Sequence, residues 1–490
     1  MEKLDINPKK VITKVKNQTG NNPDIIAKEM KLNDTDISVL FCESVSDGIT
    51  INDFILEYLQ EIKMHDVSFN DIFKYLESNL PTHKITKINN YKDLYYNLFS
   101  GFTLIIISGS DNAISIETKA KLDSGIVETK NEKVMKGPRD GFTENYQTNI
   151  GLIRKRIKSK SLRLQEHIIG SKSNTKVGII YMDNIASKKL VDEVSNKIKN
   201  IKIDGIFDSN YIIETISENK RSSFPIYIST ERPDLVNIHL LDGRIAIIVE
   251  NTPYVIIIPA LFFDFFQSSE DFYQKNINVN FTKIIRFIAL IITIVLPAIY
   301  IAISTYNLEA IPTNLLISFS TQRQGVPLPT VVEILMMMIV FEVLKETDTR
   351  APSAIGSSLT IVGTLVLGQA AVAAGIVSPI TIIVVATTSV SGLISYSVDI
   401  INGMRWWRLI FIVLASFAGL YGVFMAGLFF VIYLSSIKSF GIPYLTPIAP
   451  FFLKDQNSVL FLTNKRKFNL RNHLTAKNNI ERQDKNYEKN

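Results

Sequence analysis

The chain has 490 residues, of which 53 are basic and 47 acidic, so its formal net charge is +6. The charges are unevenly spread: the block from 281 to 453 carries only 14 charged side chains in 173 residues, far below the roughly 25% of an ordinary globular domain. This block excludes a plain soluble enzyme. The weak overall basicity gives no support for nucleic-acid binding.

Few residues are available to hold a metal or a cofactor. The single cysteine, Cys42, excludes a disulfide framework and a thiolate-rich metal site. The five histidines are scattered, with no two at ligand spacing. The sequence has no phosphate-binding loop and no GxGxxG, GxSxG or HExxH motif. We therefore expect neither an enzyme nor a cofactor or metal site.

The first half of the chain predicts two consecutive α/β subdomains. Residues 1–33, with NPKK and NQTGNNPD, are interpreted as a flexible arm whose hydrophilic start lacks the apolar core of a signal peptide. Residues 34–135 and 176–272 are the two subdomains, because short apolar runs alternate with amphipathic stretches in each. The expected strands are 37–43, 102–108, 112–117, 177–183, 224–230, 244–250 and 253–259.

Between the subdomains, residues 136–175 are predicted to form a basic helical linker. Ile150, Ile153 and Ile157 are spaced to share one helical face. The basic side chains left largely outward are Arg154, Lys155, Arg156 and Lys158. One interpretation is a solvated connecting helix, and another is docking to lipid headgroups or to an acidic partner. A third, phosphate chemistry, lacks a glycine-rich cradle and a metal-binding carboxylate cluster.

Residues 273–453 predict an α-helical transmembrane domain of four to five spans plus a re-entrant or interfacial segment. The stretches 287–308, 351–398 and 409–437 carry no charge. Since a helix needs about 20 apolar residues to cross a bilayer, the first predicts one span, the second two and the third one. The shorter apolar run 330–344 is left open between a fifth span, a re-entrant element and an interfacial helix. The proline-rich segment 441–452 is a second re-entrant candidate.

Basic residues predict the orientation. Lys283 and Arg286 precede the first apolar stretch, Arg405 and Arg408 precede the last one, and residues 454–490 form a basic tail. Lys and Arg favour the cytoplasmic side of a membrane, so both ends of the domain are expected there. An even number of crossings follows, and four is favoured.

Several residues in this block are candidates for an ion pathway or for helix packing. Glu333 is costly in hydrocarbon. It either lines an ion path, or forms a structural hydrogen bond inside the bundle or sits at an interface. The segment 356–375 has small residues at four-residue spacing, which lets membrane helices approach closely. Its packing candidates are Gly356, Gly363 and Gly368. Its pore-facing candidates are Ser358, Thr360, Thr364 and Gln369.

Three long runs carry a resemblance to a known family. They are GPRDGFTENYQTNIGLIRKRI (137–157), the run from SFPIYIST to SSEDFY (223–273) and IVGTLVLGQAAVAAGIVSPITIIVVA (361–386). Over about residues 35–460 the chain resembles the A subunit of GerA-type spore germinant receptors. The resemblance implies a protein of the spore inner membrane that assembles with a transporter-like B subunit and a lipoprotein C subunit. It also implies an A-subunit oligomer that forms a nutrient-gated cation channel, with the N-terminal region on the core side.

The chain departs from the family at Ser353-Ala354, where an Arg-Pro pair is common, and this leaves in doubt any role of that arginine. Two alternatives remain. One is a non-conducting scaffold or signalling subunit of the receptor. The other is a related spore A-type protein that modulates dipicolinic acid release.

Overall fold

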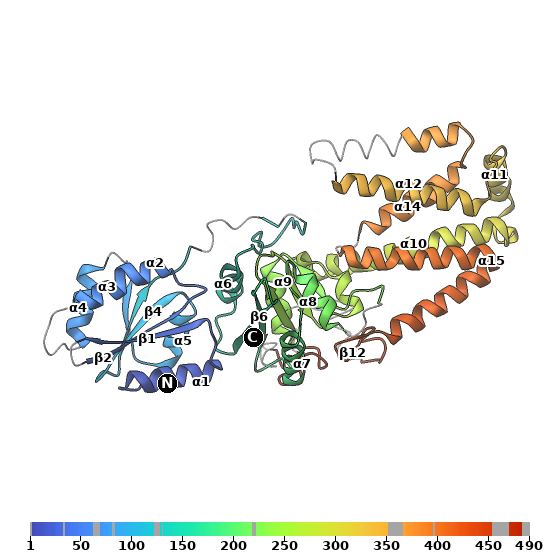
Figure 1. Cartoon of the computed structure of the whole chain (residues 1–490). Coiled ribbons are helices and arrows are strands. Elements are labelled where there is room, and N and C mark those ends of the chain that lie inside the picture. The colour runs from blue at the N-terminus through green and yellow to red at the C-terminus, as the bar shows by residue number, and fades with distance from the viewer. Residues whose placement is uncertain are drawn as a thin grey trace. The chain divides into compact units, whose positions relative to one another are not determined.

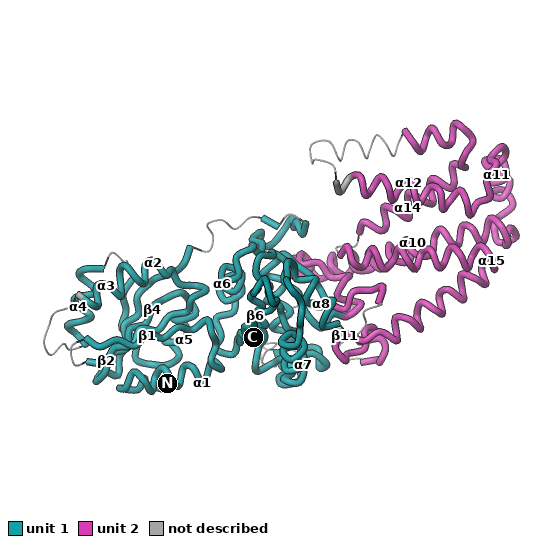
Figure 2. Tube along the Cα trace, viewed as in Figure 1, with its two compact units in different colours: residues 1–220, 227–260, 463–490 teal, residues 221–226, 261–462 magenta. Residues whose placement is uncertain are grey.

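The computed structural model describes residues 2–32, 35–61, 69–80, 84–121, 128–129, 131–217, 222–350, 366–394, 397–452 and 470–482. The chain divides into two compact units (Figure 2). Unit 1 comprises residues 1–220, 227–260 and 463–490, and unit 2 comprises residues 221–226 and 261–462. Unit 1 is α/β, as predicted for the first half of the chain, and unit 2 is mainly helical.

The first subdomain of unit 1 is a five-stranded antiparallel sheet with helices on both faces (Figure 1). The strand order is β1-β2-β4-β5-β3. Leu104 and Ile106 of β4 belong to the core that contains Val11 of α1, whereas Ile105 belongs to the opposite core with Leu76 of α4. The central strand is therefore buried on both faces, with the two-residue alternation of a strand. The elements are α1 (Pro8–Thr19), β1 (Ile25–Leu32), β2 (Thr35–Cys42), α2 (Gly48–Ile51), α3 (Glu57–Glu61), α4 (Phe69–Asn79), β3 (Ile85–Ile88), α5 (Tyr91–Leu98), β4 (Phe102–Ile107) and β5 (Ala113–Glu117).

Residues 1–33 are not a flexible arm, and this prediction was wrong. The Asn7 side chain caps α1 by accepting a hydrogen bond from the N–H of Lys9. Val11 and Val15 on one side of α1 are fully buried, and β1 pairs with β2 along its whole length. As an edge strand, β1 buries only its two end residues. Its polar middle therefore lacks the apolar run by which the other strands were recognised.

The second subdomain repeats the arrangement of the first. Its strand order is β6-β7-β9-β10-β8, which is the order of the first sheet advanced by five strands. In both sheets one helix precedes the first strand, further helices follow the second strand, and one helix follows the third. The elements are α6 (Tyr146–Arg156), β6 (Leu162–Ile169), β7 (Thr175–Met182), α7 (Lys188–Lys199), α8 (Ser209–Ile216), β8 (Ile228–Thr230), α9 (Pro233–Leu241), β9 (Ile245–Val249) and β10 (Val255–Ile258). Unit 1 is therefore a structural duplication.

The segment 136–175 is not a linker, because it supplies the first helix and the edge strand of the second repeat. Ile150, Ile153 and Ile157 of α6 are buried in the core of this repeat. Strand β6 pairs with β7 over its full length. Like β1, it lies at the edge of its sheet and exposes most of its polar side chains in part. The same structural position was thus misinterpreted in both repeats.

The described part of the C-terminal tail, residues 470–482, folds onto the second repeat. Thr475 and Ala476 are buried, and the Thr475 hydroxyl donates to the carbonyl of Asp242 at 2.7 Å. A Cβ atom on Gly243 would lie 2.8 Å from the Thr475 carbonyl oxygen. This close approach requires glycine. The tail was predicted as a basic extension, but this part of it is a packed element of unit 1.

Unit 2 contains two helices that are long and apolar enough to cross a membrane, α10 (Asn276–Thr305) and α15 (Val398–Ser436). A shorter helix, α14 (Pro379–Gly392), is also apolar. The described helices therefore do not confirm a domain of four to five spans. The other elements of unit 2 are α11 (Thr313–Arg323), α12 (Thr330–Arg350), a helix at 366–373, β11 (Lys438–Ser439) and β12 (Ile442–Pro443).

Helix α15 is a hairpin of two helical arms (Figure 1). Gly419 has φ 59° and ψ −139°, which are not helical values. Rings on either side of this glycine meet: the ring centroid of Phe430 lies 5.0 Å from that of Trp407 and 6.3 Å from that of Phe411. At 1.5 Å per residue the arms are about 30 and 25 Å long. The stretch 409–437 was predicted as one span, but the reversal at Gly419 divides it between the two arms.

Contacts between the helices give their directions. We call the end of unit 2 where α10 begins the entry end, and the opposite end the far end. Arg286 near the start of α10 and Met404 near the start of α15 line one small cavity. Beyond the end of α10, Tyr306 donates a hydrogen bond to the carbonyl of Ser416 at 2.7 Å. The first arm of α15 therefore runs parallel to α10, and its turn lies at the far end.

Helices α12 and α14 run in the opposite direction, from the far end to the entry end. Glu333 near the start of α12 bonds Ser378 at the start of α14. At the other end of α14, Ser391 lines the same small cavity as Arg286. Helices α12 and α14 are therefore parallel to each other and antiparallel to α10.

Candidate functional site

Glu333 lies in the first turn of α12 and has no exposed surface. Its Oε2 atom accepts hydrogen bonds from the backbone N–H of Ser378 at 2.9 Å and from the hydroxyl of Thr381 at 3.0 Å. Ser378 is the N-cap residue of α14. The carboxylate therefore lies at the N-terminus of α14, where the helix dipole favours negative charge.

The second carboxylate oxygen of Glu333, Oε1, faces α11. The Nη2 atom of Arg323 lies 3.8 Å from it, and among the described residues Oε1 has no hydrogen-bond partner. Two hydrogen bonds, one helix terminus and one guanidinium thus stabilise a carboxylate that would be costly in an apolar interior. In this arrangement Glu333 joins α12 to α14 and lies next to α11.

The other ion-pathway and packing candidates precede α14. Five of them lie outside the described residues: Gly356, Ser358, Thr360, Gly363 and Thr364. Gly368 is buried, and a Cβ atom there would meet two side-chain atoms of Ile382 at 3.9 Å. Gln369 is exposed. The structure therefore places Gly368 against α14 and Gln369 on the surface of unit 2.

The four basic side chains considered for docking have different environments. Arg154 is 1% exposed, and its guanidinium lies 3.3 Å from the carboxylate of Asp24. Arg156 donates two hydrogen bonds to Asp140, at 2.6 and 2.7 Å. Lys155 and Lys158 are exposed. Arg154 is therefore excluded from any docking surface, because the packing of α6 turns it into the interior of unit 1.

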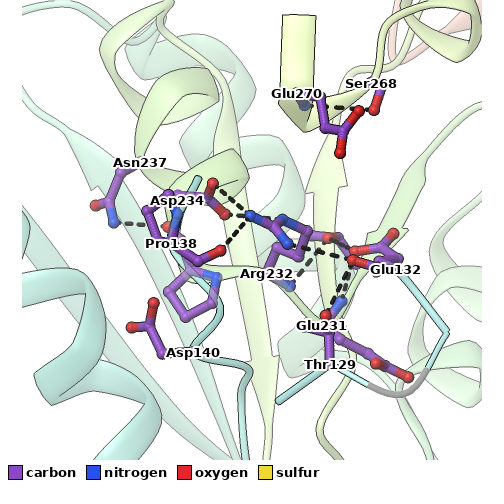
Figure 3. Close-up of polar contacts among 12 residues, drawn as sticks. Thr129, Glu132, Pro138, Asp140, Glu231, Arg232, Asp234, Asn237, Ser268 and Glu270 are labelled. Carbon is purple, nitrogen blue, oxygen red and sulfur yellow. Dashed lines mark hydrogen bonds and ion pairs between the residues drawn. The ribbon is translucent and has the colours of Figure 1, made fainter. Parts of the chain in front are cut away.

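A second buried arginine organises the start of α9 (Figure 3). Arg232 donates to both carboxylate oxygens of Asp234, at 3.1 and 2.8 Å. It also donates to the carbonyls of Glu132, at 3.2 Å, and Pro138, at 2.8 Å. Among the described residues no group of three or more His, Cys, Asp and Glu side chains is placed to hold a metal ion. We call the hydrogen bonds from Arg232 to Asp234, Glu132 and Pro138 the Arg232 clamp. These hydrogen bonds fix the segment 131–140 to the second repeat.

The Glu132 side chain extends this clamp. Its Oε2 accepts hydrogen bonds from the Thr230 hydroxyl at 2.5 Å and from the N–H of Glu231 at 3.3 Å. Glu132 and Glu231 are labelled in Figure 3. Burial raises the pKa of Glu132 to about 7, and the nearby Glu231 carboxylate also raises it, while Arg232 lowers it. The contact therefore contains a carboxyl that changes its charge close to neutral pH.

Residues 222–226 join α8 to β8 along the chain but belong to unit 2. The Tyr433 hydroxyl accepts a hydrogen bond from the N–H of Ser223 at 2.7 Å, and the Tyr444 hydroxyl donates to the carbonyl of Pro225 at 2.7 Å. Phe224 is 2% exposed, with its ring 5.9 Å from that of Phe430. The stretch 224–230 was predicted as a strand, but β8 covers only its last three residues. The first part is recruited by aromatic side chains of unit 2.

Comparison with known proteins identifies the family. The model of the Bacillus/Clostridium GerA spore germination protein family matches residues 13–474. This chain belongs to the GerA family.

Several curated proteins are similar to this GerA chain. Spore germination protein KA of Bacillus subtilis (strain 168) is 37% identical, over 92% of this chain and 84% of that protein. Spore germination protein GerLA of Bacillus cereus is 32% identical over 92% of each. The uncharacterized membrane protein YfkQ of Bacillus subtilis (strain 168) is 34% identical, over 81% of this chain and 76% of that protein.

A solved structure is also similar: the N-terminal domain of the A subunit of the Bacillus megaterium spore germinant receptor GerK3. Its sequence is 30% identical to this GerA chain, and the match covers 53% of this chain and 98% of that domain, with a TM-score of 0.43.

Most residues of the Arg232 clamp lie in the sequence runs that resemble the GerA family. Pro138 belongs to the run 137–157, and Arg232 and Asp234 belong to the run 223–273. Sequence reasoning did not connect them, because Pro138 and Arg232 are 94 positions apart in the chain. The available signal was the sequence STERPD directly after an apolar run, since charged residues at the end of a buried strand require partners.

Proposed function

We propose that this chain is the A subunit of a nutrient germinant receptor in the spore inner membrane. The observation that carries the proposal is the GerA family match over residues 13–474, which extends across both α/β repeats and the helical unit. The partners are a transporter-like B subunit, a lipoprotein C subunit, further A subunits and membrane lipid. The chain acts by binding and conformational change, without covalent chemistry.

The topology we propose has an even number of crossings, with both α/β repeats on the spore-core side. The chain leaves unit 1 after Ala260 and returns to it before the described tail, whose Ala476 is buried in the core of the second repeat. Entry and return on the same side of a membrane require an even number. Helices α10 and α12 run in opposite directions, as do α14 and the first arm of α15, which agrees with such a path.

We further propose that unit 2 of several A subunits surrounds a cation pathway. The polar candidates for its lining are Glu333, Ser358, Thr360, Thr364 and Gln369. Glu333 is engaged with Ser378 and Thr381 in this structure, so it would reach the pathway only after those hydrogen bonds break. A carboxylate repeated around an oligomer concentrates cations at a pore.

The deciding experiment compares Glu333→Gln and Glu333→Ala in spores, with cation efflux on nutrient addition and the abundance of the A subunit measured together. A pathway carboxylate predicts normal abundance and reduced efflux in the Gln variant, because only the charge is removed. A structural carboxylate predicts normal efflux in the Gln variant and low abundance in the Ala variant. Normal efflux at normal abundance in both variants would remove Glu333 from either role.

The second candidate function is a non-conducting scaffold for the receptor. It is favoured by the complete burial of Glu333 and its hydrogen bonds to α14. Conductance of the purified chain in lipid separates the two, since a scaffold would give none at any voltage. The exposed Lys155 and Lys158 are the remaining candidates for docking to lipid or to an acidic partner in either case.

A further inference from the structure

A cavity of about 260 Å³ lies among four helices of unit 2, α10, α12, α14 and α15. Its walls are mostly apolar, but four charged side chains line it: Glu342, Lys345, Arg405 and Arg408. Glu342 and Lys345 come from the second half of α12, and the arginines come from the start of α15. The sequence places these two pairs about 60 residues apart, and only the packing of unit 2 brings them together.

The charges in this cavity do not balance. Glu342 forms an ion pair with Arg405. The Nη2 atom of Arg408 is 3.9 Å from the other Glu342 oxygen, which is too far for a hydrogen bond. Arg408 is 9% exposed, and its Nε has no hydrogen-bond partner among the described residues. Three cationic side chains therefore share one carboxylate, and repulsion among them in a partly apolar cavity is unfavourable.

The position of the cavity along the helices indicates where an anion would come from. The charge-free stretch 409–437 begins directly after Arg408, and the apolar run 330–344 ends directly before Lys345. Both helices thus pass from polar to apolar sequence at the cavity, as helices do at the level of lipid headgroups. Basic pockets between helices at this level bind anionic headgroups.

We propose that this cavity binds the phosphate of an anionic membrane lipid, held by Arg405, Arg408 and Lys345. A guanidinium presents parallel N–H groups that match two phosphate oxygens. The volume accommodates a phosphodiester with part of its glycerol, while the acyl chains continue along the apolar surface. Because α10, α12, α14 and α15 all contribute to the walls, an occupied site stabilises their packing by mass action.

The chain contains a built-in reporter for this site. Its two tryptophans, Trp406 and Trp407, lie between Arg405 and Arg408. The experiment titrates the full-length protein in neutral detergent with phosphatidylglycerol, phosphatidylcholine or inorganic phosphate. Tryptophan emission and melting temperature are recorded. We expect a saturable emission change and a higher melting temperature with phosphatidylglycerol alone. Equal effects of the two lipids, or full saturation by inorganic phosphate, would overturn the assignment to an anionic lipid.

Three variants test the geometry. Arg408→Gln should weaken the apparent affinity for phosphatidylglycerol by about tenfold, which is the effect of losing one hydrogen-bonded charge contact. Glu342→Gln should strengthen it, because it removes the one acidic competitor among the described residues that line the cavity. Lys275→Gln is the matched control, since it removes an exposed positive charge at the start of α10, outside the cavity.

The Glu342→Gln result keeps the test decisive if Arg408→Gln does not fold. Affinity that is unchanged or weaker in the Glu342→Gln variant would overturn the proposal, because an arginine cluster that serves only to pair Glu342 gains nothing from its loss. The Lys275→Gln variant should bind phosphatidylglycerol as the unmodified chain does, and a loss there equal to that of Arg408→Gln would mean that binding follows general surface charge.

Discussion

The guanidinium of Arg154 lies 3.3 Å from the carboxylate of Asp24, and the two side chains are 1% and 0% exposed. Asp24 precedes the edge strand of the first repeat, whereas Arg154 belongs to the first helix of the second. Asp24 also accepts hydrogen bonds from the Ser44 N–H at 2.9 Å and from the Cys42 thiol at 2.9 Å. This buried ion pair thus joins the two repeats at equivalent positions. Asp24 lies between α1 and β1, and Arg154 lies in the last turn of α6, shortly before β6.

Breaking this pair should destabilise unit 1. Arg154→Ala leaves Asp24 buried without its cation, so we expect the free energy of unfolding to fall by about 3–5 kcal/mol. Replacing both residues, with Asp24→Asn and Arg154→Met, should recover much of this loss because no buried charge remains. Thermal unfolding measures both effects. The neighbouring exposed Lys155→Ala is the control, and a loss there as large as in Arg154→Ala would contradict the role of burial.

The reversal of α15 should depend on Gly419. A Cβ atom at this position would lie 2.8 Å from the Cβ of Tyr306, and the backbone conformation is strained for other residues by about 1–3 kcal/mol. Gly419→Ala should therefore lower the melting temperature and the abundance of the protein. Gly427 lies in the second arm with nothing within 4 Å of a Cβ, so Gly427→Ala should be tolerated. Equal melting temperatures of the Gly419→Ala and Gly427→Ala variants would mean that the packing of the two arms does not depend on a glycine at position 419.

Docking of the tail should depend on Gly243. Its φ is 83°, and a Cβ atom would lie 2.9 Å from the Cα of Ala476. Gly243→Ala should release residues 470–482 and make them sensitive to protease. Gly109 has a similar φ of 87° with nothing within 4 Å, so Gly109→Ala imposes the backbone strain without the steric contact. If protease cleaves the tail equally fast in both variants, backbone strain alone explains its release, and the steric contact with Ala476 does not.

The Arg232 clamp should weaken as the pH rises. Burial raises the pKa of Glu132 from 4.5 to about 7, so between these values the folded state binds a proton that the unfolded state has released. The contribution to stability is therefore largest at low pH and is lost as the pH rises through about 7. Hydrogen exchange of residues 131–140 should accelerate from about pH 5 to 8 beyond its intrinsic rate. Glu132→Gln should remove this extra dependence, and its persistence in that variant would place the titrating group elsewhere.

Much of the fold was predictable from local patterns in the sequence. The buried central strands of both sheets are apolar runs, so β4 and β9 fall within the predicted ranges 102–108 and 244–250. The edge strands β1 and β6 were missed because half of each strand faces solvent and carries charged side chains. The repetition of strand order showed that both errors concern the same position. Arg154 was wrongly predicted to face outward for a related reason. Its basic neighbours suggested that this face of α6 is exposed to solvent, but the structure buries Arg154 against Asp24.

By itself, the sequence determined the division into an α/β half and an apolar helical half, and its long motifs pointed to the GerA family. The division depends on composition, because each residue contributes to hydropathy whatever lies elsewhere in the chain. The motifs depend on the order of neighbouring residues. Only the tertiary structure decided that α15 reverses at Gly419, that Glu333 bonds to the N-terminus of α14 and that Glu342 lies near two arginines. These relationships depend on which surfaces pack together across tens of residues, and the free energy of burying a charge is determined by the partners found there.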